Sequence, residues 1–85
     1  MKRKMHKYAI EIFYSKEDEG YIAVVPELPG CSAFGETEEE ALNEIKIEMD
    51  LWLETAKKEG RKIPVPQGKE LFNIFYNKKF AEQIF

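Results

Sequence analysis

The segment from Thr37 to Gly60 carries the clearest structural signal in this chain of 85 residues. Thr37 is followed at the third position by Glu40, the spacing of a capping box, in which both side chains accept hydrogen bonds from backbone N–H groups left unpaired at a helix start. Gly60 suits the left-handed residue that often ends a helix. The segment therefore predicts a helix from about residue 38 to residue 59.

The apolar positions of this helix predict which side faces the core. They fall within an arc of roughly 120°, the width of a stripe that covers one face of a sheet. The stripe consists of Ala41, Leu42, Ile45, Met49, Trp52, Leu53 and Ala56.

Two further apolar residues, Ile47 and Leu51, lie four residues apart on the opposite side of the helix. Their neighbours on that side are Glu40, Glu44, Asp50 and Glu54. A pair of exposed aliphatic residues is ordinary on any surface. The alternative is a contact patch for a partner or for the tail of this chain.

Three β-rich runs precede the helix. Residues 7–14 alternate between two sides, and residues 21–25 follow after a polar loop, so the pair predicts a hairpin. Prolines take residues 26–30 out of the sheet, because proline has no N–H to donate. Residues 31–34 form a short third strand. The second strand is apolar on both sides, which suggests that the helix covers one face and a second subunit the other.

The chain continues with Pro64 and Pro66, which favour an extended connector, and then an apolar tail. We predict a fourth strand over residues 70–76 and a short helix over residues 78–85. The expected fold class is α+β: an antiparallel sheet of three or four strands covered on one face by one long helix, in the order β-β-β-α-β. Residues 1–66 form the domain, and residues 67–85 belong to it or to an oligomer interface.

Self-association is expected because of the size of the chain. A domain this short buries only about 60% of the surface of its unfolded chain, so its stability is marginal. We expect a dimer or tetramer in which apolar tail residues form contacts. The residues predicted for oligomerisation are Phe72, Ile74, Phe75 and Tyr76.

Charge is strongly segregated along the sequence, although the net charge is only −3. Residues 17–54 carry twelve acidic side chains and one basic, whereas the segments on both sides carry a net positive charge. Such a block repels a phosphate backbone and attracts a basic partner. The alternative is that the acidic side chains are a solvated helix face.

The predicted cellular location rests on the lack of membrane-span and signal-peptide patterns in the sequence. No run approaches the roughly 18 apolar residues of a membrane span, and the basic N-terminus is followed by alternating residues instead of the apolar region of a signal peptide. Cys31 is the only cysteine, so it forms no intrachain disulfide, which is consistent with a reducing compartment. We expect a cytoplasmic protein without a membrane contact.

Residues suited to catalysis do not form a recognisable site. His6 is the only histidine and has no metal-ligand spacing around it, and Cys31 has no histidine to activate it. An enzymatic alternative is a degenerate nuclease that uses Glu11 with Mg²⁺, but one strand carboxylate does not make a two-metal site. We predict no catalytic residue, no metal site and no cofactor.

The segments described above share a set of residues with a known family, in the same order and at the same spacing. These residues are Tyr8, Ile10, Gly20, Tyr21, Pro26, Glu27, Leu28, Pro29, Gly30, Cys31, Gly35, Thr37, Glu40, Ala41, Leu42, Trp52, Leu53, Ile63 and Pro64. Over about residues 7–66 the chain thereby resembles the HicB family of antitoxins. The resemblance implies a partial RNase H-like fold without the acidic active site of true RNase H enzymes. It also implies a domain that binds and occludes a small basic HicA-type toxin that cleaves mRNA.

The sequence departs from this family after Pro66. Full-length HicB antitoxins often add a helix-turn-helix or ribbon-helix-helix domain that binds the operator, and the 19 residues that follow Pro66 are too few to complete one. We therefore do not expect direct DNA binding by this chain. Glu27 stands where aspartate is common in the family, a change that keeps the charge.

The sequence thus predicts a non-enzymatic antitoxin that neutralises a HicA-type toxin through an acidic surface. The alternative is an orphan structural oligomer or scaffolding module of the same fold, with no toxin partner. The residues predicted to contact the partner are Glu27, Leu28, Glu40, Glu44, Ile47 and Leu51.

Overall fold

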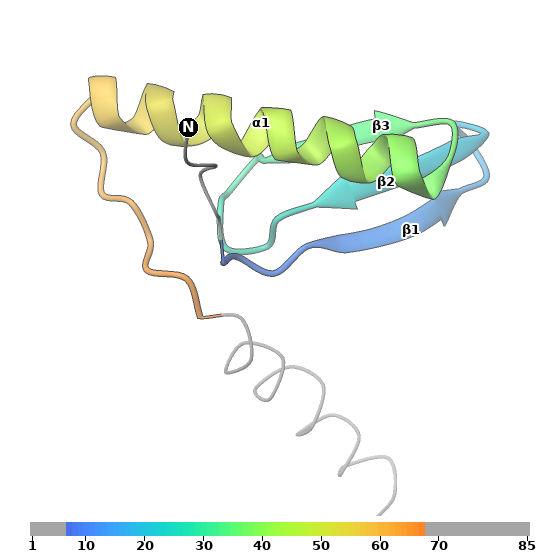
Figure 1. The fold of residues 1–85 in the computed structure, drawn as a ribbon, viewed down its shortest axis with the longest axis horizontal. Coiled ribbons are helices and arrows are strands. Elements are labelled where there is room, and N and C mark those ends of the chain that lie inside the picture. Colours follow the sequence, from blue (N-terminus) through green and yellow to red (C-terminus); the bar gives the residue numbers. More distant parts are fainter. Residues whose placement is uncertain (1–6, 68–85) are drawn as a thin grey trace, which may run out of the picture. The chain divides into compact units, whose positions relative to one another are not determined.

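The computed structural model describes residues 7–67 and contains three strands followed by one long helix (Figure 1). Residues 10–64 form one compact unit, and residues 7–9 and 65–67 are grouped apart from it. The predicted α+β class is confirmed. The predicted fourth strand and second helix lie outside the described residues. The elements are β1 (Glu11–Ser15), β2 (Gly20–Val24), β3 (Ser32–Gly35) and α1 (Glu38–Lys58).

The sheet is antiparallel throughout, with the strand order β1-β2-β3. The first strand begins at Glu11, opposite Val24, and not at residue 7 as the alternation predicted. The reason lies in the partner strand. Strand β2 ends at Val24 and the chain turns away at Pro26, so the pairing of β1 with β2 begins at Glu11.

Both ends of α1 are closed by the residues that the sequence indicated. Thr37 Oγ1 accepts a hydrogen bond from the Glu40 N–H at 3.1 Å. The Glu40 carboxylate accepts one from the N–H of Glu36 at 3.3 Å, one residue before the cap. At the other end Gly60 has a φ of 69°, and Arg61 donates its N–H to the carbonyl of Ala56 at 2.8 Å. This bond and the one from Gly60 to Lys57 form a Schellman motif.

The helix covers one face of the sheet and lies mainly over β3 (Figure 1). Its buried residues are Ala41, Ile45, Met49 and Ala56, all from the predicted stripe. Ala23 of β2 is fully buried beneath it. Gly35 lies so close to the helix start that an added Cβ would be 2.7 Å from the Ala41 Cα. Small residues therefore set the short distance between helix and sheet.

No described element lies over the opposite face of the sheet (Figure 1). Of the helices in residues 7–67, none is long and apolar enough to cross a membrane.

Candidate partner-binding surface

The side of α1 that faces away from the sheet carries the predicted apolar pair. Ile47 is 53% exposed and Leu51 is 51% exposed, one helical turn apart. The helical period places four exposed carboxylates around them. We call this surface the acidic helix back; it consists of Glu40, Glu44, Ile47, Asp50, Leu51 and Glu54.

Negative charge on α1 is densest at the start of the helix, where Glu40 of the acidic helix back lies. Three consecutive glutamates, residues 38–40, occupy the first turn. Toward the other end, Glu54 pairs with Lys58 at 3.6 Å, and both side chains are largely exposed. Such a surface pair contributes little to stability, but Lys58 offsets part of the local charge. The electrostatic attraction for a positively charged group would therefore be strongest near the N-terminal part of the helix.

A loop between β2 and β3, residues 25–31, contains both prolines of the predicted contact region; we call it the proline loop. The N–H of Leu28 donates to Val25 O, and that of Cys31 donates to Leu28 O, each at 3.0 Å. Pro29 and Gly30, with a φ of 79° at Gly30, occupy the central positions of the second turn. This is the arrangement of a type II turn, in which glycine accommodates the positive φ.

These two turns direct the Leu28 side chain into the core, where it is only 1% exposed. Leu28 was predicted to contact the partner, but its side chain is not accessible at the surface of the described residues. Its neighbour Glu27 is half-buried. The sequence predicted an exposed loop but gave no indication of which side chain the turns would bury.

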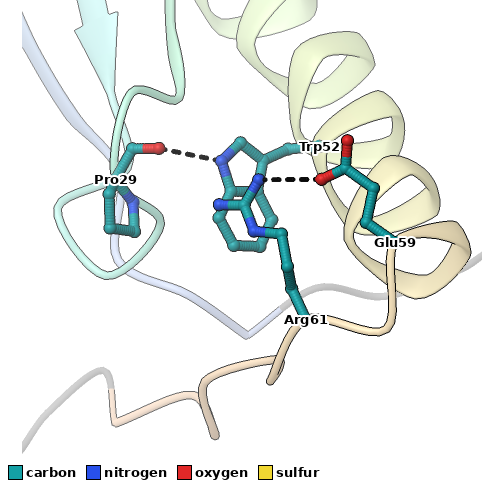
Figure 2. Close-up of polar contacts among 4 residues, drawn as sticks. All are labelled: Pro29, Trp52, Glu59 and Arg61. Carbon is teal, nitrogen blue, oxygen red and sulfur yellow. Dashed lines mark hydrogen bonds and ion pairs between the residues drawn. The ribbon is translucent and has the colours of Figure 1, made fainter.

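Trp52 joins the proline loop to the helix (Figure 2). Its indole Nε1 donates a hydrogen bond to the carbonyl oxygen of Pro29 at 2.8 Å. The guanidinium carbon of Arg61 lies 5.1 Å from the centre of a Trp52 ring, within cation–π range. Arg61 also pairs with Glu59 at 3.3 Å. The sequence placed Trp52 in the core stripe but did not predict either polar contact.

Replacing Trp52 with phenylalanine is expected to lower the free energy of unfolding by about 1 kcal/mol, because the hydrogen bond to Pro29 is lost while an aromatic ring remains. Urea denaturation followed by far-UV circular dichroism measures this change. The same substitution made in an Arg61→Ala background separates the cation–π contribution. A Trp52→Phe protein as stable as the parent would contradict the role of the hydrogen bond.

Few side chains in residues 7–67 are placed to act as a nucleophile or to hold a metal ion. Burial, and to a smaller extent the negative charge of Glu48, raises the pKa of the Cys31 thiol. The buried thiol therefore favours its neutral form, which is a poor nucleophile. Across the same residues, no group of three or more His, Cys, Asp or Glu side chains is placed to hold a metal ion.

The predicted oligomerisation residues lie outside the described part of the chain, so they stay predictions. They are Phe72, Ile74, Phe75 and Tyr76.

Comparison with known proteins identifies the relatives of this chain. Residues 8–85 match the sequence model of a family described as HicB_like antitoxin of bacterial toxin-antitoxin system. A UPF0150 protein of Synechocystis sp. is 47% identical over 53 residues, which cover 62% of this chain and 73% of that protein. A UPF0150 protein of Thermoplasma acidophilum is 41% identical over 66 residues, which cover 76% of this chain and 93% of that protein.

No solved structure matches the chain significantly, so the RNase H-like assignment stays a prediction. The family match, in contrast, extends over nearly the whole sequence and includes both the proline loop and the helix. The chain therefore belongs to the family of HicB-like antitoxins of bacterial toxin–antitoxin systems.

Proposed function

We propose that this protein neutralises a small basic HicA-type ribonuclease toxin by binding it through the acidic helix back. Membership of an antitoxin family supports a toxin as the kind of partner. The observation that carries the proposal is the half-exposed pair Ile47 and Leu51 set among exposed carboxylates. A protein that binds mRNA needs a positive surface, and an acidic surface can occupy it.

The two kinds of side chain would contribute differently to this interface. Carboxylates around the apolar pair attract a basic partner over a distance and raise its association rate. Ile47 and Leu51 would be buried on contact, so they would slow dissociation. Glu27 in the proline loop stays in the proposed contact set, and Leu28 is removed from it because it is buried.

Co-expression with any small open reading frame found adjacent to this gene is the first test. If that frame encodes a HicA-like toxin, we expect the chain to restore growth and to co-purify with it. A HicA-like neighbour that neither binds the chain nor loses its toxicity would refute the proposal.

Substitutions on the helix back test the surface itself. Glu44→Lys is expected to lower the association rate constant by about tenfold at low salt, an effect that shrinks as salt screens the charges. Ile47→Ala and Leu51→Ala are each expected to raise Kd by about tenfold, mainly through faster dissociation. Surface plasmon resonance with the immobilised toxin separates the two rate constants.

The matched control is Glu17→Lys, which makes the same charge change in the exposed loop between β1 and β2. We expect it to leave the dissociation rate unchanged and to affect association less than Glu44→Lys does. Glu40 is unsuitable for this test, because its carboxylate also accepts a hydrogen bond at the helix start. Equal effects at Glu17 and Glu44 would show that only the net charge of the protein matters.

A further inference from the structure

The sheet face that α1 does not cover is apolar; we call it the open sheet face. Phe13, Ile22 and Phe34 are paired across the three strands, so they form one row on this face. Phe13 is 48% exposed and Phe34 is 42% exposed. Strand alternation gives the outward positions around this row. The open sheet face consists of Glu11, Phe13, Ile22, Val24, Ser32 and Phe34.

One of the two aromatic rings lies against the sheet and does not project from it. A Cβ added at Gly20 would be 2.5 Å from Cε1 of Phe34, so the Phe34 ring occupies the space above this glycine. Because Gly20 has no side chain, the Phe34 ring can lie close to the backbone of β2. A low aromatic ring beside Ile22 gives a surface suited to packing against another flat surface.

The two occupants to compare are a basic partner and a second copy of this chain, and the charge distribution favours the second copy. Glu11 is its only ionisable residue among the six positions, whereas the carboxylates of α1 lie on the other side of the sheet. A basic partner is attracted to the helix side, where the negative charge is. A second copy carries the same negative helix, so it meets least repulsion at the face without that charge.

We propose that a second copy of this chain covers the open sheet face, so that the two sheets pack face to face with the helices outward. A twofold interface is self-complementary, and Phe13, Ile22 and Phe34 would all lie close to the axis. We place the axis along the row, across the strands. The loop of residues 16–19, with three acidic residues and one lysine, then lies at opposite ends in the two copies.

This arrangement extends the proposed function, because both acidic helix backs stay accessible to toxin.

The interface between the two sheets is small, however. Three strands spaced about 4.8 Å apart and up to five residues long span a face of about 14 by 17 Å, well below the about 800 Å² that each partner buries in a standard stable interface. We therefore expect a weak dimer that dissociates on dilution, and a concentration series is the informative measurement.

Thiol labelling of the full chain tests which molecule covers the face. Phe13→Cys is made in a Cys31→Ala background, and its reaction rate with a maleimide is measured from about 1 μM to about 1 mM protein, a range chosen to include a weak Kd. We expect the rate to fall several-fold at high concentration. Leu51→Cys in the same background is the control, and its rate is expected to stay constant.

Sedimentation equilibrium of Phe34→Glu gives a second readout. We expect the dimer to be lost, while Leu51→Glu, the same charge change on a half-exposed leucine, leaves it intact. Circular dichroism checks that both variants are folded. If Phe34→Glu does not fold, the labelling series decides alone.

Several results would overturn the proposal. Rapid labelling of Phe13→Cys at every concentration would show an uncovered face. Slow labelling at every concentration would identify an occupant within the same chain. Protection that appears only after toxin is added would assign the face to the toxin. A dimer that persists in folded Phe34→Glu would place self-association elsewhere.

Discussion

Substituting alanine for Gly35 is expected to lower the free energy of unfolding by about 3 kcal/mol, because overpacking of this kind forces backbone to move. The added Cβ would lie 2.7 Å from both the Ala41 Cα and the Glu40 carbonyl carbon, and neither is the end of a flexible side chain. In a domain of this size each kcal/mol is worth about 4–8 °C, so the melting temperature should fall by roughly 12 °C or more.

Thermal denaturation measures this loss, and Gly60→Ala is the matched control. Gly60 has a φ of 69°, but an added Cβ there meets no atom within 4 Å. Its substitution is expected to cost only about 1 kcal/mol, the penalty of a left-handed backbone. If Gly35→Ala were no more destabilising than Gly60→Ala, close packing of β3 against the helix start would not be the reason for glycine at this position.

Truncating Leu28 to alanine is expected to cost about 3 kcal/mol, the usual loss for a fully buried leucine. The side chain is 1% exposed, although it belongs to a loop between two strands. Urea denaturation gives the change in stability. Leu51→Ala, made on an exposed leucine, is the control and should change stability by no more than about 0.5 kcal/mol.

These two leucines also separate core packing from partner binding. Leu28→Ala should reduce toxin binding only to the extent that it unfolds the protein, whereas Leu51→Ala should weaken binding without loss of stability. A stable Leu28→Ala protein that no longer bound toxin would restore Leu28 to the contact surface.

The elements that local chemistry specifies were predictable from the sequence. A helix start needs an acceptor for its free N–H groups, and Thr37 with Glu40 is the pair that supplies it. A helix end with a left-handed residue needs glycine, and Gly60 adopts a positive φ. Both helix boundaries were therefore correct to within one residue, and the core stripe was correct because its 3.6-residue period is strong.

Features that depend on contacts between distant segments were not predictable in the same way. The first strand was predicted to begin at residue 7, because alternation does not show where its partner leaves the sheet. The hydrogen bond from Trp52 to Pro29 joins residues 23 positions apart and leaves no local pattern. For the candidate site, the helical period placed Ile47 and Leu51 correctly on the exposed side, but no periodic pattern applies to Leu28 in its loop.

Small residues packed between α1 and the sheet determine the position of the helix. They therefore also determine the position of the exposed side chains that the helix carries. Ala23 and Ala41 are fully buried, and Gly35 touches the helix start. Because such positions offer no side-chain rotamer that can adjust, an extra methyl group must displace the helix as a rigid rod. The same rod carries the carboxylates proposed to meet the toxin. Pairing specificity between antitoxin and toxin can therefore evolve through conservative changes in the interior, without any substitution at the interface.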